Sequence, residues 1–285
     1  MSIEKITVEK REISRETTFF HQIAEPNSVS CRAHIHSTIE LLYVVEGSYR
    51  VTADGDEYNI FAGDLTLFSS NTIHHVTAGG EARNSYYVMK IPPTIFLSVL
   101  PRESAYEYVM RFALKRPEHR YLWRADELAG TRMLSIIEDL IREQDEMAYA
   151  YDVSIALGIT SLLVEILRET EPIKETVSTR TAEIIYRVIE HISRHYSDEL
   201  DERAIAAEIG MSYSYFSRTF KRITGSSFRE HLNHTRIARA EQLLLRTGKP
   251  ISEIASECGY NSLSYFISVY KRLTGKTPTA VLKSR

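Results

Sequence analysis

Three histidines and one glutamate stand at spacings that can bring their side chains to one point. We call His34, His36, Glu40 and His74 the histidine–glutamate cluster. Residues two apart on a β-strand share a face, so Arg32 projects to the same side as the first two histidines, and the glutamate begins the next apolar run. Imidazole and carboxylate groups together suit borderline divalent metals such as Zn, Fe, Mn or Ni. The cluster is therefore a candidate metal site.

The same residues suit two other roles. Together with Arg32 and Tyr43 they would line a pocket for a small polar ligand. Tyr43, Tyr49, Tyr86 and Tyr87 add flat apolar faces with polar tips, on which a carbohydrate could stack. Histidines in such a place can also be purely structural. A bound divalent metal, a polar ligand pocket and a structural role therefore all stay open.

Short β-strands must position these residues. In roughly the first hundred residues, runs such as ELLYVVEGSYRV and NIFAGDLTLFSS are bounded by turn residues at about ten-residue spacing. This pattern predicts an antiparallel barrel or sandwich. HIHSTIELLYVVEG and GDLTLFSSNTIH also resemble the two motifs of the cupin barrel, over residues 28–89. Metal-binding cupins carry ligands at the positions of the cluster, but Ser69, Asn71 and Ala78 replace the usual Pro, Gly and Asn of the second motif.

The periodicity then becomes helical. Residues 126–168 predict two helices whose leucine-rich faces either pack on the barrel or form part of a dimer seam. Residues 171–180 are polar, contain a proline and predict a linker. We therefore expect a multidomain α+β protein: a sensing and dimerisation domain in residues 1–170, the linker, and an all-α domain in residues 181–285.

A basic and aromatic phrase occurs twice in the all-α part. It is YFSRTFKRITG from Tyr215 and YFISVYKRLTG from Tyr265, and the flanking residues also align, with one residue inserted before the second phrase. An insertion inside a helix would rotate its buried face by about 100°, whereas a turn absorbs it. The two copies are therefore predicted to be helix-turn-helix units, in residues 201–225 and 250–275.

The first copy has the residues that such a unit requires. Ala206 permits close helix crossing, Gly210 permits positive φ in the turn, and Phe216 fills the shared core. Ser212 is a predicted N-cap. Residues 228–247 predict a connecting helix of about 30 Å, close to the roughly 34 Å that separates successive major grooves on one face of DNA.

The distribution of charge along the chain favours a polyanionic binding partner. The net charge is -3, yet the chain after Val177 holds 17 Lys and Arg against 11 Asp and Glu, and from Arg203 onward 14 against 5. A basic surface of this kind is expected to meet nucleic acid. Early residues of a recognition helix reach base edges in the major groove, while Lys and Arg neutralise phosphates.

At these residues the chain resembles the AraC family of transcription regulators, over about residues 181–283, including RIARAEQLLLRTGKPISEIASECGYNSLSYF and YKRLTG. The resemblance implies two helix-turn-helix units joined by a long helix. It places base contacts at Ser214, Ser217, Arg218, Ser264, Ile267 and Ser268. Phosphate contacts are expected at Lys221, Arg222, Lys271 and Arg272. Many members carry Arg at the position of Ser268, so the second unit is expected to contribute mainly phosphate contacts and shape readout.

Two functional hypotheses follow. The first is a cytoplasmic transcription regulator, a homodimer that binds double-stranded DNA, senses a small molecule such as a carbohydrate, and has RNA polymerase as a further partner. The second is a metal-dependent cupin enzyme with a helical nucleic-acid-targeting domain. The charged N-terminus, the lack of a long apolar run and only two cysteines argue against export or a membrane location. No local motif suggests another catalytic site.

Overall fold

The N-terminal half of the computed structural model consists of two antiparallel sheets. The structure describes residues 11–12, 17–34, 36, 38–53, 56–70, 72–81, 83–114, 121–169 and 178–283. The strands are β1 (Arg11–Glu12), β2 (Thr18–Ala24), β3 (Val29–His34), β4 (Ile39–Glu46), β5 (Ser48–Ala53), β6 (Asp56–Phe61), β7 (Leu65–Phe68), β8 (His74–Ala78), β9 (Asn84–Ile91) and β10 (Leu122–Trp123). One sheet has the order β1-β2-β9-β4-β7-β10 and the other β3-β8-β5-β6. The predicted antiparallel, cupin-like fold is confirmed.

Alternating side chains on β4 explain how the first sheet is buried on both faces. Leu41 faces the helices that cover the sheet, while Leu42 and Val44 face the second sheet. Apolar residues from both sheets fill the space between them: Phe20, Leu42, Val44, Tyr49, Val51, Ile60, Phe68, Val76, Tyr86 and Val88. The interior of the barrel is therefore packed with side chains over most of its length.

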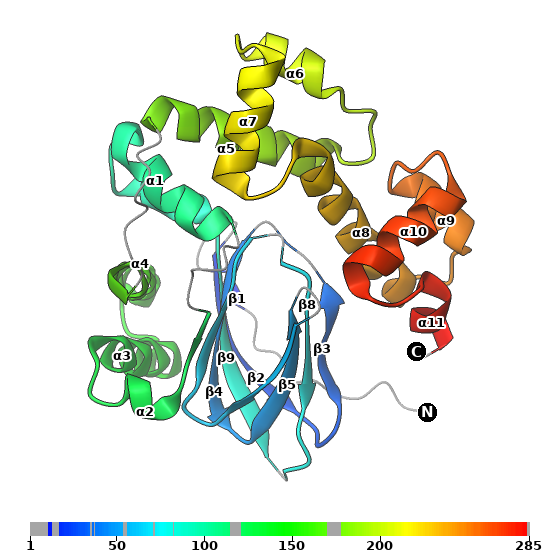
Figure 1. Cartoon of the computed structure of the whole chain (residues 1–285). Helices are drawn as coiled ribbons and strands as arrows, with labels where there is room; N and C mark the ends of the chain where they lie inside the picture. Colours follow the sequence, from blue (N-terminus) through cyan, green and yellow to red (C-terminus); the bar gives the residue numbers. More distant parts are fainter. Residues whose placement is uncertain are drawn as a thin grey trace.

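Helices cover the outer face of the first sheet (Figure 1). A 3-10 segment, η1 (Pro93–Ser98), leads into α1 (Arg102–Ala113), a helix that the sequence interpretation left out. The short α2 (Ala125–Leu128) precedes the antiparallel pair α3 (Arg132–Glu146) and α4 (Tyr151–Glu169), which occupies the segment predicted to be helical. Met147, at φ 48°, ends α3. None of the described helices is both long and apolar enough to cross a membrane.

The C-terminal part is entirely helical among its described residues. Its helices are α5 (Thr179–His195), α6 (Glu202–Glu208), α7 (Tyr213–Thr224), α8 (Phe228–Arg246), α9 (Ile251–Glu257), α10 (Leu263–Thr274) and α11 (Pro278–Lys283). Because α5 begins at Thr179, the last two residues of the predicted linker belong to this helix, and residues 170–177 lie outside the described part of the chain.

The two helix-turn-helix units repeat each other in detail. In both, a helix of 7 residues is followed by a helix of 12 residues. Ser212 and Ser262 cap the longer helices by accepting a hydrogen bond from the backbone N–H three residues later. Gly225 and Gly275 end them with φ of 77° and 73°. The inserted residue lies in the second turn, as predicted.

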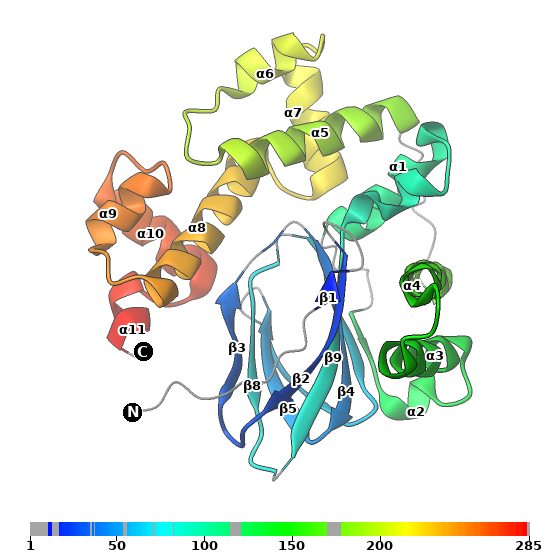
Figure 2. The ribbon, with the colours of Figure 1, turned by 180° about the vertical axis from the view of Figure 1, so that it is seen from behind.

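The two units nevertheless belong to different hydrophobic cores. Phe216 and Phe220 of the first unit are part of one continuous core with α1, α5 and the helices that cover the sheet, whereas Phe266 and Tyr270 belong to a separate C-terminal core. Helix α8 contributes to both, and it also contacts β3 (Figure 2). The first unit is therefore packed against the N-terminal half of the molecule, and the second is attached mainly through α8.

Candidate functional site

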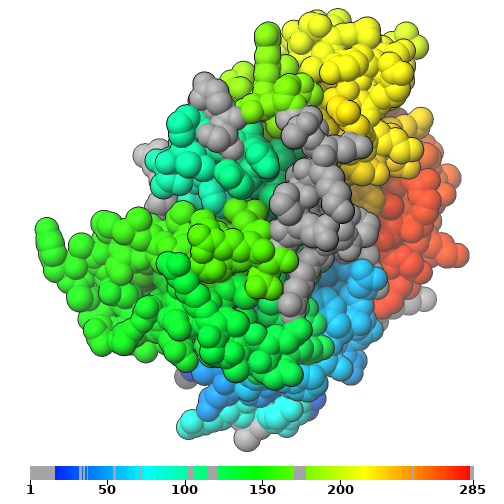
Figure 3. Space-filling model, turned by 60° about the vertical axis from the view of Figure 1, so that its left-hand side comes forward, coloured from blue at the N-terminus to red at the C-terminus, as the bar shows by residue number. Residues whose placement is uncertain are grey.

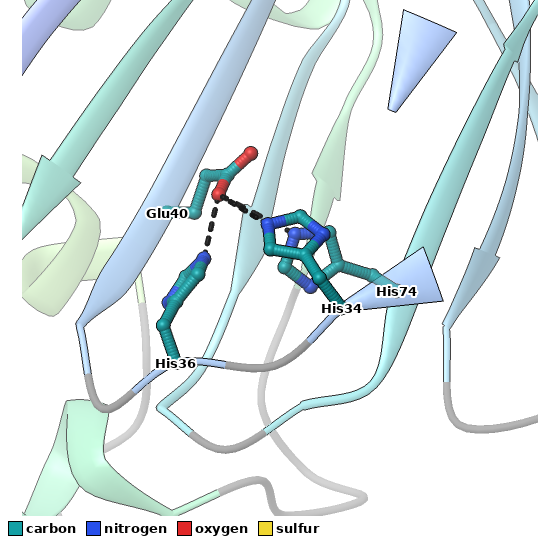
Figure 4. Close-up of side chains that lie close together, drawn as sticks. All are labelled: His34, His36, Glu40 and His74. Atoms are coloured by element: carbon teal, nitrogen blue, oxygen red, sulfur yellow. Dashed lines mark hydrogen bonds and ion pairs between the residues drawn. The ribbon is translucent and has the colours of Figure 1, made fainter. Parts of the chain in front are cut away.

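The histidine–glutamate cluster forms at the end of the barrel that faces the helices. Its three histidines all direct Nε2 at one oxygen of Glu40 (Figure 4). The distances from Oε2 are 3.7 Å to His34, 2.7 Å to His36 and 3.3 Å to His74. The four potential ligand atoms lie within 4.8 Å of one another. The structure thus brings together the four residues that the spacing in the sequence had singled out.

Strand pairing produces this convergence. His34, at the end of β3, is the direct partner of His74, at the start of β8, and a register shift just before His34 marks an irregularity in β3. Glu40 lies at the start of β4, where it pairs with Phe68 of β7. The ring of Phe68 stacks on that of His74 with centroids 4.1 Å apart, which holds the imidazole in place.

Backbone carbonyls orient two of the imidazoles. His36 Nδ1 lies 2.9 Å from the Thr38 carbonyl oxygen, and His74 Nδ1 lies 3.0 Å from that of Thr72. A carbonyl only accepts, so in a metal-bound form an Nδ1–H that donates to it would leave the Nε2 lone pair free for the ion. Histidines that bind metals usually donate their other N–H in this way. His74 Nε2 is fully buried and makes no hydrogen bond with the described residues.

Burial and the neighbouring charges act in opposite directions on the pKa values of the cluster. Burial alone would raise the pKa of Glu40, but the charges of His74 and Lys90 and the hydrogen bonds from His34 and His36 hold it well below its usual range. Burial lowers the pKa of His36 to about 4, although its hydrogen bond with Glu40 acts in the opposite direction. Burial also acts to lower the pKa of His34, but hydrogen bonds with Cys31 and Glu40 raise it on balance.

Sequence reasoning missed two members of this neighbourhood. Lys90 Nζ lies 3.0 Å from Glu40 Oε2 and 3.2 Å from His34 Nε2. Cys31 Sγ lies 3.2 Å from His34 Nδ1, so this cysteine is in contact with the cluster. Lys90 pairs with Glu40 across β9 and β4, fifty residues apart in the chain, and no local spacing signals that pairing.

The predicted polar pocket is only partly assembled. Tyr43 projects from the opposite face of β4, beside Glu138 of α3, because side chains on a strand alternate between faces. Its assignment to the same ligand site as the cluster is therefore wrong. The side chain of Arg32 lies outside the described residues.

The four tyrosines proposed as a sugar-stacking surface are likewise divided. Tyr49 and Tyr86 are buried in the barrel core with ring centroids 4.8 Å apart. Tyr87 lies on the other face, stacked on His21, and its hydroxyl lies 3.5 Å from Asp145 Oδ1. These tyrosines form no single surface for a ligand.

The cluster suits a divalent metal by its donor chemistry. Three imidazole nitrogens and a carboxylate oxygen are ligands that Zn, Fe, Mn and Ni accept. The buried Nε2 atom of His74 that lacks a hydrogen bond and the carbonyls that accept from Nδ1 agree with this role. The ammonium group of Lys90 contacts both Glu40 and His34, so it would compete with such an ion for these two ligands.

The second candidate site is the outer surface of α7 and α10. Equivalent positions of the two helices have the same exposure: Ser214, Arg218, Lys221, Arg222, Ser264, Ser268, Lys271 and Arg272 are exposed, and Ser217 and Ile267 are half-buried. Arg218 Nε donates to the Ser214 carbonyl oxygen at 3.1 Å, one turn earlier. The opposite faces carry the buried Phe216 and Phe266. Each helix therefore presents a polar and basic surface to solvent.

Other arginines of the C-terminal part serve the fold. Arg236 donates to the carbonyl oxygens of Tyr196 and Asp198 at 2.7 and 2.9 Å, and lies over the ring of Tyr260. Arg239 lies over Tyr196. These side chains join the start of the C-terminal part to α8, so part of the basic excess counted in the sequence is structural.

Two family models match the chain. Residues 17–156 match an AraC-like ligand binding domain, and residues 205–284 match a helix-turn-helix domain. The first match covers the barrel with α3 and the beginning of α4, and the second begins inside α6 and continues through the second helix-turn-helix unit.

Similar proteins include several regulators. The chain is 27% identical over 241 residues to the HTH-type transcriptional regulator GadX of Escherichia coli O127:H6, which covers 84% of each protein. It is 26% identical over 237 residues to the arabinose operon regulatory protein of Escherichia coli K12, covering 82% of this chain and 77% of that protein. ToxT from Vibrio cholerae O395 has a TM-score of 0.55 at 15% identity, covering 93% of this chain and 97% of that one. This last likeness shows a shared fold.

The lowered pKa of His36 predicts acid sensitivity. Between pH 6.5 and about 4 the unfolded chain binds a proton at this residue that the folded protein excludes. In protein kept metal-free with a chelator, the free energy of unfolding should therefore decrease as the pH falls through this window. Denaturant titrations at several pH values measure the slope.

The variant His36→Gln should flatten this dependence, and His191→Gln, at an exposed position of α5, should leave it unchanged. An equally steep slope in His36→Gln would show that His36 does not titrate as described.

Proposed function

The chain belongs to the AraC family of DNA-binding transcription regulators with an N-terminal ligand-binding domain, and from this we propose how it works. A homodimer binds double-stranded DNA through α7 and α10, and the occupancy of effector sites in the N-terminal half controls that binding. The relatives named above are regulators, which favours this hypothesis over a metal-dependent enzyme.

The main support for DNA binding is the similarity between the exposed surfaces of α7 and α10. Two helices with the same exposed polar positions and the same basic residues in the last turn are suited to two segments of one duplex. Helix α8 between them has 19 residues, or about 28 Å at 1.5 Å per residue, which is close to one turn of DNA. Base contacts would come from Ser214, Ser217 and Arg218, and mainly phosphate contacts from the second unit.

A selection of bound sequences from a random DNA pool tests the DNA-binding proposal. Two half-motifs separated by about ten base pairs are expected, because successive major grooves on one face recur at this interval. Recovery of no enriched motif at moderate salt would contradict sequence-specific binding.

Within the barrel, we propose that the histidine–glutamate cluster holds a divalent transition metal. Such an ion would neutralise Glu40 and bind His74 Nε2, a buried atom that makes no hydrogen bond with the described residues. In a regulator, the ion would act as a ligand or as a structural centre that shifts the population of domain arrangements. His34 of the cluster ends β3, and β3 contacts α8, the helix that connects the two DNA-binding units.

The relatives point to different organic effectors. The arabinose and melibiose operon regulatory proteins of Escherichia coli are named for carbohydrate operons. One ToxT structure from Vibrio cholerae, with 18% identity and a TM-score of 0.54, is described as bound to an unsaturated fatty acid, and it covers 95% of this chain and 96% of that one. A carbohydrate-like effector is favoured here, because the hydroxyl groups of Thr38, Ser70, Thr94 and Ser193 line the cavity described in the next subsection.

The outer face of α4 is the proposed dimer interface. Val153 and Leu157 are 55% and 61% exposed, and with Thr160 and Val164 they continue at the alternating spacing of four and three that is typical of coiled coils. The opposite face of the helix buries Ile155 and Ile159. Figure 3 shows the α3–α4 pair as an exposed outer layer beside the barrel, accessible to a second copy.

Two further parts of the proposal follow from DNA binding itself. A regulator of this family acts where the chromosome is, so we place it in the cytoplasm. An activating output would require contact with RNA polymerase bound beside it.

Replacing Arg218 tests the base-contact assignment. Arg218→Ala should weaken binding to the selected DNA by about 1 to 3 kcal/mol and relax base preference at one position, if the guanidinium contacts a base edge. Gel-shift titrations at fixed salt measure both effects. Arg187→Ala, an exposed arginine of α5, is the control and should bind as the wild type does. Unchanged affinity and base preference in Arg218→Ala would refute the assignment.

Metal binding is tested with two adjacent histidines. The wild type should take up about one equivalent of Zn²⁺ or Co²⁺, and His74→Ala should lower that affinity by at least about tenfold. His75→Ala is the matched control, because the next side chain on β8 points to the other face and is influenced by Lys276. Lys90→Met should strengthen metal binding, because it removes a competing cation. Elemental analysis and competition with a chelating dye measure these effects. Equal affinity in His74→Ala and His75→Ala would exclude the site.

The dimer proposal predicts the effect of a charge on α4. Leu157→Asp should convert the protein to a monomer, because burying an unpaired carboxylate in an apolar seam is unfavourable. Val99→Asp introduces the same charge at another exposed apolar position and should leave the association state unchanged. Sedimentation velocity distinguishes the outcomes. A wild-type protein that stays monomeric at micromolar concentration would also contradict the proposal.

A further inference from the structure

A cavity lies where the end of the barrel meets the first helix of the DNA-binding part. Its volume is about 290 Å³, enough for a ligand of roughly monosaccharide size. The N-terminal half contributes Thr38, Ser70, Pro92, Pro93, Thr94 and Ala113, and α5 contributes Tyr186, Ile189, Glu190, Ser193 and Arg194. A molecule in this cavity would therefore touch both halves of the protein.

One of the lining hydroxyl groups lacks a partner. Ser70 is 7% exposed, and its Oγ makes no hydrogen bond with any described residue. A buried hydroxyl in that state costs free energy that a polar ligand would recover. Thr38, Thr94 and Ser193 add three more hydroxyl groups to the lining. The cavity is therefore rich in groups that can both donate and accept hydrogen bonds.

The charges of the lining cancel one another. Glu190 Oε1 lies 3.5 Å from Arg194 Nη2, and the hydroxyl of Tyr186 lies 3.4 Å from the same carboxylate oxygen. A charged ligand would find no net opposite charge here, whereas a neutral ligand with several hydroxyl groups can use the planar carboxylate and guanidinium as hydrogen-bonding partners. Pro92, Pro93 and Ile189 supply apolar surface for the C–H faces of such a molecule.

We propose that this cavity binds a neutral polyhydroxylated molecule of about monosaccharide size. The ligand would hold α5 against the end of the barrel, and α5 in turn contacts α7 and α8. Because the ligand would contact both halves, it favours the arrangement in which they are packed together. The regulatory consequence rests on the proposed function, whereas the binding itself does not.

Thr38 connects this cavity to the histidine–glutamate cluster. It lines the cavity, and its Oγ1 lies 2.8 Å from His36 Nδ1. A ligand that engages the Thr38 hydroxyl would change which partner His36 Nδ1 has. The two sites are therefore adjacent but chemically distinct, one suited to a metal ion and the other to a neutral polyol.

Binding can be measured on the full-length protein with a defined panel of probes: D-glucose, D-galactose, L-arabinose, L-rhamnose, D-ribose and myo-inositol. At least one probe should bind in isothermal titration calorimetry or saturation-transfer NMR. Ser193→Trp, which fills the cavity, should weaken that binding at least tenfold. Arg187→Trp places the same indole at an exposed position of α5 outside the cavity and should have no effect. Ser70→Ala should weaken binding by a smaller factor while leaving the volume nearly unchanged.

Two results would overturn the inference. The first is no binding of any probe up to about 50 mM, a concentration well above the millimolar range of weak specific ligands. The second is undiminished binding in a Ser193→Trp protein that has the wild-type circular dichroism spectrum. A gel shift of the same preparations on the selected DNA separates this outcome from failure of the proposed function. Retained DNA binding without sugar binding rejects only the cavity, and the reverse result rejects only the DNA-binding proposal.

Discussion

The packing of α5 against α1 joins the two halves of the molecule, and the cavity between them depends on it. Helix α5 buries Ile185 and Ile189 in a core that continues through α1 to the sheet and through Phe216 into the first DNA-binding unit. Because protein interiors are close-packed, a displacement of one side chain in such a core also displaces its neighbours. The first unit is thereby placed by the N-terminal half, and a change at their junction acts directly on it.

The second unit is attached differently. Its own core is formed with the C-terminal half of α8, and α8 also contacts β3, the strand that ends at His34. In Figures 1 and 2, helices α9, α10 and α11 lie beside this edge of the barrel. The two units are similar in sequence, yet they are therefore connected to the N-terminal half through different contacts. This asymmetry gives an effector two routes to DNA binding, one through α5 and one through β3 and α8.

The histidine–glutamate cluster and the interdomain cavity share the same end of the barrel. The rest of the barrel interior is filled by residues such as Tyr49, Tyr86 and Phe68, so it leaves little room for an organic effector among the described residues. Polar chemistry is concentrated instead at the junction, where loops from both sheets meet α1 and α5. Such a location is suited to regulation, because a ligand there interacts differently with the joined and separated arrangements.

Features that depend on local spacing could be predicted from the residues alone. The duplicated units, the Ser212 cap, the positive φ of Gly210 and the inserted turn residue were predictable because helix geometry and backbone sterics act over a few residues. The four members of the cluster were predictable because two motifs and strand alternation placed them. Lys90 and the opposite orientation of Tyr43 were not, because the first depends on pairing between distant strands and the second on which sheet face meets the helices. The docking of α5, and with it the cavity, could not be predicted in this way, because an apolar helix face must be buried but does not specify the surface against which it packs.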